Sequence, residues 1–337
     1  MPTIKDVARE CGVSANTVSC VLNNKPGEVS ARTRERILDA IRRLGYRPNA
    51  AARHMVGKRT NTIGIADRYT DSAYINPYKT QILESLVQTA RRNRLDVLYY
   101  SGHPSEEQVS NFPAYLDGRC DGLICYTGGI DQEEANAILQ TGLPVVFVGE
   151  TPFAQDGAVI DVDNEAGAYL AVTHLTELGH TRIAMMPGNG TSGNVERIAG
   201  YRRALAERNI AFDSAYLYST YAWEDVAYEQ GLHALALPER PTAVFCYNDP
   251  IAFGLLRAAR ELGIRVPEQL SIVGFDDIPP AAMTTPPLTT VRQPLSLIGQ
   301  RAVEILIGVI EGNLPRNHRE ITPPDLILRS STAVASR

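Results

Sequence analysis

The sequence predicts a small all-α headpiece followed by a two-lobed α/β body, and three observations lead to this prediction. Residues 3–44 carry apolar side chains at helical spacing. Beyond residue 61, short apolar runs alternate with helical segments, which predicts parallel sheets covered by helices. Charge divides the chain at the same place, because residues 1–60 carry 12 Lys and Arg against 5 Asp and Glu.

The whole chain has a net charge of −5, so residues 61–337 carry −12. A basic head on an acidic body is typical of a protein in which one module alone meets nucleic-acid phosphates. The length of 337 residues is enough for two or three hydrophobic cores.

The N-terminal segment predicts two short helices around a tight turn. Thr3 caps the first helix, Gly12 ends it, and Ser14 caps the second. The second helix buries Val18 and Val21 and leaves small side chains facing outward: Ala15, Asn16, Thr17, Ser19 and Cys20. Small polar side chains of this kind can enter the major groove of DNA. A plain helical hairpin gives the same local pattern, and the basic charge together with a third helix favours the DNA reader.

The third helix begins at Ser30 and ends at Gly45, and Pro48 prevents its continuation. Residues 48–60 then have two interpretations. They form a plain linker, or they form a hinge helix that folds only on DNA. In the second case Met55 is an apolar wedge and Arg53 a cation at the minor groove.

The body predicts two similar α/β lobes. Strands are expected at residues 63–66, 97–100, 122–125, 144–148, 159–161, 183–186, 215–218, 243–246 and 271–274. Helices are expected at residues 77–93, 164–178, 194–208, 223–236 and 249–262. Ligands of such folds bind at the carboxyl ends of the strands, which predicts a ligand cleft between the lobes.

Several classes of protein are disfavoured. No apolar run reaches the ~18–20 residues that cross a bilayer, and the N-terminus has no signal-peptide core, so we expect a cytoplasmic protein. Five cysteines without a C-x-x-C pair favour reduced thiols, and we expect neither a metal nor a cofactor. Residues 188–193 match G-x-G-x-x-G, which leaves an NAD-linked oxidoreductase as a distant alternative. The strand expected next lacks the acidic residue that such an enzyme needs, and we expect no catalytic residues.

A set of motifs, in order along the chain, resembles the lactose/galactose repressor (LacI/GalR) family. The motifs are residues 3–8, 12–14, 17–19, 21–23 and 44–49 in the headpiece and 162–164, 179–184, 248–249, 273–277 and 287–291 in the body. The resemblance covers essentially the whole chain. It implies a transcriptional regulator, most often a repressor and no enzyme, whose core is similar to type I periplasmic binding proteins.

The resemblance also implies a domain plan. The headpiece is expected at residues 1–47, the hinge at 48–60 and the effector-binding and dimerisation core at 61–337. Within the core, the N-lobe is expected at residues 61–161 and 292–321 and the C-lobe at 162–291 and 322–337. The chain end has no leucine heptads, which favours a homodimer over a tetramer held by a coiled coil.

For DNA, the resemblance implies a near-palindromic double-stranded operator contacted by Thr3, Ser14, Ala15, Asn16, Thr17, Ser19, Cys20, Asn23, Ala52, Arg53 and Met55. Ala15, Asn16 and Cys20 fall on base-reading positions. Family members often place Arg or His where Cys20 stands, and a thiol cannot make the bidentate guanine contact worth ~1–3 kcal/mol. We therefore expect an unusual operator, and we expect Cys20→Arg to shift preference toward guanine. For Asn16, contact with adenine and contact with phosphate both remain open.

For the effector, the resemblance implies a cleft formed by Asp67, Tyr69, Arg197, Trp223, Asn248 and Asp276. Polar groups that bind hydroxyls, together with an aromatic face, indicate a sugar, with a purine effector or a protein corepressor as alternatives. Trp223 is a stacking platform in this interpretation and a core residue in the plainer one. Asp277 is expected to be a structural cap of the strand end.

Overall fold

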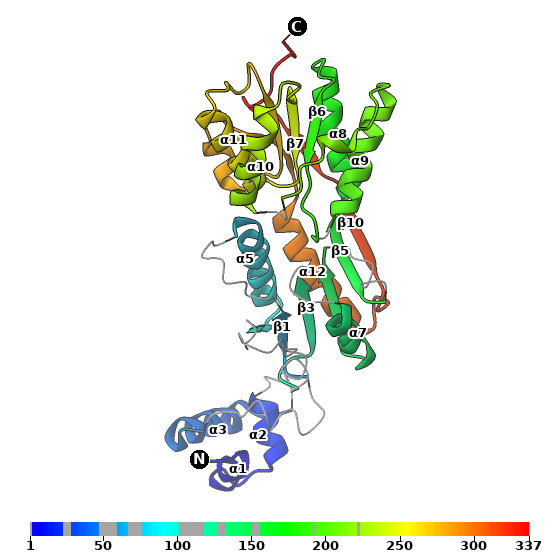
Figure 1. Cartoon of the computed structure of the whole chain (residues 1–337). Coiled ribbons are helices and arrows are strands. Elements are labelled where there is room, and N and C mark those ends of the chain that lie inside the picture. The colour runs from blue at the N-terminus through cyan, green and yellow to red at the C-terminus, as the bar shows by residue number, and fades with distance from the viewer. Residues whose placement is uncertain are drawn as a thin grey trace. The chain divides into compact units, whose positions relative to one another are not determined.

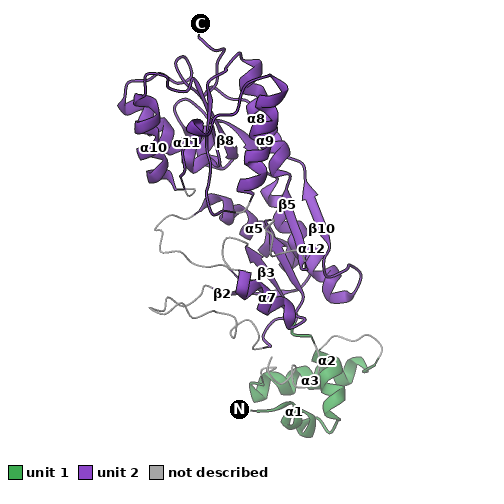
Figure 2. Cartoon of the chain, turned by 45° about the vertical axis from the view of Figure 1, so that its right-hand side comes forward, with its two compact units in different colours: residues 1–60 green, residues 61–337 purple. Residues whose placement is uncertain are grey.

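The chain forms two compact units, Met1–Thr60 and Asn61–Arg337 (Figure 2). The structure is a computed structural model, and it describes residues 2–22, 28–46, 59–66, 76–100, 118–126, 132–149, 156–191, 193–220 and 223–336. The predicted hinge residues 48–58 lie outside the described residues.

The first unit is a three-helix headpiece made of α1 (Ile4–Glu10), α2 (Ala15–Leu22) and α3 (Ala31–Leu44). The Thr17 amide donates to Ser14 Oγ (3.0 Å) at the start of α2, and Gly45 ends α3 in the left-handed region at φ 62°. The three helices pack around a small apolar core to which each contributes: Val7, Ala8, Cys11, Val18, Val21, Ile37 and Ala40. The predicted helix pair and third helix are therefore present.

The second unit contains two sheets with helices on both faces, as Figure 1 shows. The first sheet has six parallel strands in the order β10-β5-β4-β3-β1-β2. Its strands are β1 (Thr62–Ala66), β2 (Asp96–Tyr100), β3 (Gly122–Tyr126), β4 (Val145–Val148), β5 (Ala158–Val162) and β10 (Arg319–Thr322). Its helices are α5 (Pro77–Arg92), α7 (Gln132–Gln140) and α12 (Leu295–Glu311). We call this sheet with its helices the N-lobe.

The second sheet has five strands in the order β11-β9-β8-β7-β6, of which only β11 runs antiparallel to its neighbour. Its strands are β6 (Ile183–Met186), β7 (Ala243–Cys246), β8 (Ser271–Asp276), β9 (Thr289–Arg292) and β11 (Asp325–Ile327). Its helices are α8 (Asn164–Glu177), α9 (Asn194–Glu207), α10 (Glu224–Ala236) and α11 (Asp249–Glu261). We call this sheet with its helices the C-lobe.

The chain passes between the lobes three times: after β5, between β9 and α12, and between β10 and β11. Two of these crossings are joined, because the Asp163 amide donates to Thr322 O (2.8 Å) and Thr322 Oγ1 donates to Asp161 O (3.1 Å). Helix α12 belongs to the N-lobe, where Leu295, Val303 and Leu306 pack with residues of β1, β4 and α5. The N-lobe core is therefore completed by a segment that follows the C-lobe in the sequence.

The two helix pairs of the C-lobe are built alike. Helices α8 and α9 approach so closely that a Cβ on Gly200 would lie 2.2 Å from Glu165 O, and one on Gly254 would lie 2.2 Å from Glu224 O between α10 and α11. Arginine–tyrosine stacks cover both contacts, at 4.0 Å for Arg203 on Tyr169 and 3.7 Å for Arg257 on Tyr228. Close packing at glycine makes each pair a rigid unit.

One predicted strand is wrong. Residues 215–218 were expected to form a strand, but the segment contains a short 3-10 helix, η3 (Ser214–Tyr216), and a single bridge from Leu217 to Met185. Asp213 caps this turn by accepting from the Ala215 amide (2.8 Å), a local interaction that overrides the β-propensity of the tyrosines. Among the described residues, no helix has the length and apolar character needed to cross a membrane.

Candidate functional site

The predicted DNA-reading surface lies on α2. The Asn16 side chain is exposed, and Ala15, Thr17 and Ser19 are half-buried. Thr17 is held at the helix start, where its hydroxyl lies 2.9 Å from Ser14 Oγ. The surface therefore presents one exposed amide among small side chains, which suits close approach to a groove. Asn23, Ala52, Arg53 and Met55 lie outside the described residues.

Cys20 departs from the prediction that it faces outward. The residue is only 6% exposed, and Sγ donates to Glu28 Oε2 at 2.7 Å. Helical periodicity places Cys20 on the same side of α2 as Asn16, but that periodicity carries no information on Glu28, which belongs to the segment after the helix. The thiol is covered and donates to a carboxylate, so the prediction that Cys20 faces outward is wrong.

The predicted effector cleft centres on Arg197, which α9 places at the end of the C-lobe sheet. The residue is 4% exposed. Its Nε donates to Asn164 Oδ1 (2.9 Å), and one terminal nitrogen donates to Tyr247 O. The guanidinium also lies 4.2 Å from the ring centroid of Tyr247 and 3.6 Å from that of Phe275. Because two aromatic rings lie against the guanidinium and two of its nitrogens donate within the protein, a ligand would meet only its remaining N–H groups.

Two carboxylates lie at the ends of strands near Arg197. Burial raises the pKa of Asp276 to about 7, and Arg197 and the amide of Gln293 oppose this rise. Gln293 Nε2 donates to Asp276 Oδ1 at 2.7 Å. Burial likewise raises the pKa of Asp161 to about 6, although the Val162 amide and Arg197 lower it. The strand ends near Arg197 thus carry two carboxylates whose pKa burial raises, and a ligand that donates hydrogen bonds to them would stabilise their ionised forms.

The backbone supports this arrangement at Asp276, which has a φ of 121°. A side-chain-bearing residue rarely adopts this conformation, and such strain is concentrated at ligand sites. The following residue, Asp277, accepts from Arg292 Nε (2.7 Å) and from an Arg329 terminal nitrogen (2.5 Å). Asp277 is structural as expected, but it acts through two ion pairs and not as a cap of local amides.

The sequence-based interpretation missed several residues of this site. Tyr78 is the second residue of α5 in the N-lobe, and burial raises the pKa of its hydroxyl well above 10, with further contributions from Asp161 and Asp276. Asp161, Asp276 and Arg197 all influence the pKa of this tyrosine, so it lies near the charged groups at the strand ends. The only sequence signal for Tyr78 was its position after Pro77 at the start of a predicted helix, and this signal was too weak to identify it as a site residue. Asp161 ends the strand predicted at residues 159–161 and so fits the expected pattern of polar residues at strand ends, but it was not included among the predicted effector-binding residues.

The other predicted cleft residues are placed unequally. Asn248 is half-buried and caps α11, where its Oδ1 accepts from the Ile251 amide (2.9 Å), which leaves its Nδ2 as the group available to a ligand. Trp223 precedes α10 and is 48% exposed, which argues against the core interpretation. Asp67 and Tyr69 lie outside the described residues.

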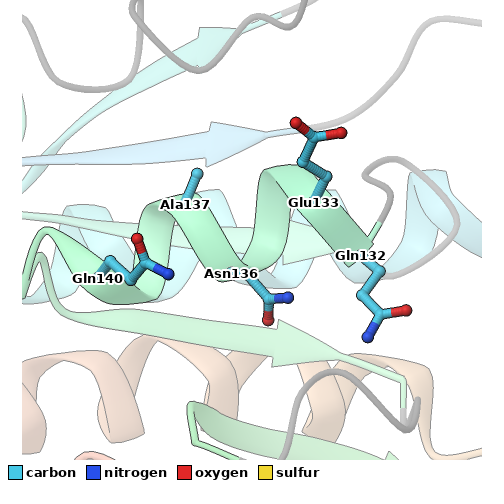
Figure 3. A pocket seen from close by; sticks show the side chains of 5 residues that line it. All are labelled: Gln132, Glu133, Asn136, Ala137 and Gln140. Carbon is cyan, nitrogen blue, oxygen red and sulfur yellow. The ribbon is translucent and has the colours of Figure 1, made fainter.

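A hollow is present on the surface of the N-lobe, away from these residues. It runs along α7 and is lined by Gln132, Glu133, Asn136, Ala137 and Gln140, whose side chains Figure 3 shows. The lining is largely amide and carboxylate, from one helix, without the buried charges of the cleft. We assign it no role in ligand binding.

The glycine motif at residues 188–193 has a packing role in the cleft wall. A Cβ on Gly188 would lie 2.6 Å from the Tyr247 ring, and one on Gly193 would lie 2.7 Å from the Asn164 amide. Tyr247 and Asn164 are the two residues that accept from Arg197. The strand expected after the motif is absent from the segment 215–218, so the βαβ context of a dinucleotide site is missing.

Comparisons with known proteins agree with this architecture. Residues 3–49 match the family model described as bacterial regulatory proteins, lacI family, and residues 172–332 match the periplasmic binding protein-like domain. The chain is 32% identical to the HTH-type transcriptional regulator DegA of Bacillus subtilis, with 98% of each chain covered. It is 34% identical to the HTH-type transcriptional repressor PurR of Vibrio cholerae, over 97% of this chain and 98% of that one.

Solved structures extend the comparison to the fold. The lac repressor dimer bound to operator and the anti-inducer ONPF has a TM-score of 0.84 and 29% identity, over 98% of this chain and 99% of that one. The transcriptional regulator CelR in complex with cellobiose has a TM-score of 0.74 and 29% identity, over 98% and 100%. These relatives are regulators, so the oxidoreductase alternative is not supported. The chain belongs to the LacI family of bacterial regulatory proteins and is a DNA-binding transcriptional regulator.

Proposed function

We propose that this regulator acts in the cytoplasm as a homodimeric repressor of a near-palindromic operator. One headpiece presents one α2, which is enough for one half-site, and a two-fold partner supplies the second. The likeness to the lac repressor dimer on its operator supports this assembly. The charge of residues 1–60 supports attraction to phosphates by the headpiece, in contrast to the acidic body.

Within the headpiece, Asn16 is the residue we propose to read a base. It is the exposed amide at the start of α2, and an amide can pair with adenine through two hydrogen bonds. Thr3, Ser14, Ala15, Thr17 and Ser19 are proposed to contact the backbone or the groove walls, together with Asn23, Ala52, Arg53 and Met55, which lie outside the described residues. Cys20 takes an indirect role, because its contact with Glu28 fixes the segment after α2.

The effector we propose is a small neutral sugar bound in the cleft. The observation that carries this proposal is that the buried Arg197 and the buried carboxylate of Asp276 lie near enough for Arg197 to lower the pKa of Asp276. A sugar hydroxyl donates and accepts, so neighbouring hydroxyls can donate to Asp276 while they accept from Arg197. The exposed ring of Trp223 offers an apolar face to the sugar ring. Asp67, Tyr69 and Asn248 are proposed to complete the contacts.

Coupling to DNA would follow from the position of the site between the lobes. Asp161 belongs to the N-lobe and Asp276 to the C-lobe, so one ligand that contacts both changes their relative free energy of closure. The three chain crossings would transmit that change to the N-lobe, and the strand β1 of this lobe follows the headpiece in the sequence.

The experiment is a thermal-shift screen of the full-length protein. Neutral sugars, including ribose and cellobiose, are compared with the purines hypoxanthine and guanine. A ligand at a hundred times its Kd stabilises the folded core by about 2.7 kcal/mol, which raises the melting temperature. The shift should be reduced in Asp276→Asn and retained in Asn16→Ala, which leaves the cleft intact. Shifts by purines alone would overturn the sugar assignment and favour a purine effector.

The fluorescence of Trp223, the single tryptophan of the chain, tests whether the ligand reaches the cleft. Stacking of a sugar on the indole should change the emission in proportion to saturation. Trp223→Phe should abolish the signal and weaken, without abolishing, the thermal shift. A ligand that shifts the melting temperature while the emission stays constant would refute the stacking role.

A further inference from the structure

The end of α5 carries a cluster of three exposed arginines, Arg91, Arg92 and Arg94. Arg91 and Arg92 lie in the last helical turn, and Arg94 follows the C-cap residue Asn93. Two cations in a last turn are accounted for by the negative end of the helix dipole. The helix dipole does not account for Arg94, because this residue lies beyond the helix. Arg94 also adopts the left-handed conformation at φ 59°, which costs less conformational free energy for Gly.

The cluster lies at the edge of the N-lobe sheet where the chain arrives from the headpiece. The amide of Asp96, two residues after Arg94, donates to Asn61 O at 2.8 Å, and the Asn61 amide donates to Asp121 Oδ2 at 2.8 Å. The residues between the described headpiece and the described body are 47–58, which span at most about 45 Å when fully extended. A short tether therefore joins the DNA-binding unit to the edge that carries the arginines.

The ion pairs among the described residues of the body do not include this cluster. Several other exposed arginines of the body pair with carboxylates: Arg203 with Glu165 (2.6 Å), Arg208 with Glu177 (3.1 Å) and Arg257 with Asp225 (3.2 Å). Within the described part of the chain, no carboxylate lies at ion-pair distance from Arg91, Arg92 or Arg94. In a body with a net charge of −12, three exposed arginines within four consecutive residues are a local concentration of positive charge.

We propose that Arg91, Arg92 and Arg94 form a second, sequence-independent DNA contact, to backbone phosphates that flank the bases read by the headpiece. Guanidinium groups bind phosphate oxygens through paired hydrogen bonds, and each phosphate neutralised releases a counterion. The contact adds affinity for DNA of any sequence and keeps the acidic body from being repelled by the duplex. It presupposes that the headpiece binds an operator, as proposed above.

The test compares two variants of the full-length protein that lose the same charge. Arg92→Gln/Arg94→Asn removes two cations from the cluster, and Asn suits the left-handed backbone at position 94. Arg260→Gln/Arg265→Gln removes two exposed arginines around the end of α11 in the C-lobe. Affinity is measured against salt concentration for the operator in a long duplex, for the operator cut to its reading length, and for a random duplex.

The cluster variant should bind the long and random duplexes more weakly, with a salt slope smaller by about 0.9 for each phosphate that it no longer neutralises. Its preference for operator over random DNA should be unchanged, and its affinity should fall less on the short operator. The C-lobe variant should retain the wild-type slope. Sedimentation verifies that both variants keep the wild-type oligomeric state.

Three outcomes would overturn the proposal: equal slopes in wild type and cluster variant, an equal fall in affinity in both variants, or a cluster variant that changes oligomeric state and not DNA affinity. The last outcome would assign the arginines to an interface between copies of this chain. If the wild-type protein itself selects no operator from a random pool, the proposed function fails. A selective wild type with an unaffected cluster variant refutes the second contact alone.

Discussion

The proposed DNA-reading surface and the proposed effector cleft hold their side chains in opposite ways. In the headpiece, Asn16 is exposed on a short helix, and the core beneath it comes from three neighbouring helices. In the cleft, Arg197 is buried between two rings and bonded to residues from α8 and the end of β7. The exposed Asn16 side chain can adjust its conformation when DNA binds. The guanidinium of Arg197 is instead held in one position before a ligand binds.

This difference predicts how substitutions separate. At the headpiece surface, a substitution should change DNA affinity with little change in folding. In the cleft, substitution of a buried charge should change folding and ligand affinity together, because the groups that remain lose their compensation. Each experiment below either separates the two regions or finds that they are coupled.

The largest effect is expected for Arg197→Gln. Loss of the guanidinium leaves Asp161 and Asp276 buried without a cation, and breaking buried charge interactions of this kind costs about 3–5 kcal/mol. Denaturant unfolding of the full chain should show this loss, and effector binding should fall at least ~100-fold, corresponding to about 3 kcal/mol. Arg208→Gln is the control, because its exposed pair with Glu177 is worth at most about 1 kcal/mol.

If Arg197→Gln unfolds no more easily than Arg208→Gln, the guanidinium is not the preorganised centre of the cleft. Operator affinity in the absence of effector, measured below the melting temperature of the variant, should stay near the wild-type value. A large loss of operator affinity there would break the separation between the two regions.

A second effect of intermediate size is the pH dependence that Asp276 introduces. Its pKa is raised to about 7 in the folded protein, whereas an aspartate in the unfolded chain has a pKa of about 4. Between these values the folded state retains a proton that the unfolded state has released. The contribution of Asp276 to the free energy of unfolding therefore falls as pH rises from about 4 to about 7.

Asp276→Asn should flatten this part of the stability profile and raise stability at pH 8 relative to wild type. An effector that donates to the carboxylate favours its ionised form, so affinity should rise with pH through about 7 and then level off. Calorimetry in two buffers of different ionisation enthalpy measures the proton released on binding. Affinity that is constant between pH 6 and 8 would contradict this role for Asp276.

The smallest effects are expected in the headpiece. Asn16→Ala should weaken operator binding by roughly 1–3 kcal/mol, if the amide pairs with a base, without lowering the melting temperature. Cys20→Ala should lower the melting temperature with little change in operator affinity. It removes the donor to Glu28 and leaves the exposed face of α2 intact. Selection from a randomised operator pool distinguishes them, because Asn16→Ala alone should relax preference at a symmetric pair of positions.

The burial of Cys20 also changes the expectation for Cys20→Arg. A guanidinium does not fit the covered position beside α2, so we now expect loss of headpiece stability before any gain of guanine preference. A stable variant with a clean shift toward guanine would restore the exposed position that the sequence suggested.

The sequence predicted the headpiece and most elements of the lobes well, because helix caps and apolar periodicity are local. The ends of α8, α9 and α11 lie within one residue of the expected positions. The segment at Ser214–Tyr216 was wrong because a capped turn overrode its β-propensity. Helices α7 and α12 and the strands β9, β10 and β11 were not predicted, since their pairing depends on chain segments far apart in the sequence.

The site shows the same limit. Arg197 and Asp276 were selected through the family resemblance, whereas Tyr78 and Asp161 were not, because their importance comes from shared burial with Arg197 and not from a motif. Cys20 was misplaced for a related reason: the partner that covers it, Glu28, lies outside the helix whose periodicity was used. Local sequence patterns predict helices and strands. The site depends on contacts between residues far apart in the sequence, which these patterns do not contain.

The three chain crossings limit how this protein can be divided. A cut after Val162 releases a fragment that contains β1–β5 but lacks α12, so apolar residues that pack on Leu306 would face water. The complementary fragment would carry α12 with no sheet to cover. Neither lobe can therefore be exchanged between proteins by joining two sequences at one position. A chimera that transfers ligand specificity must exchange every segment that belongs to the lobe. The headpiece, which the chain leaves only once, has no such restriction.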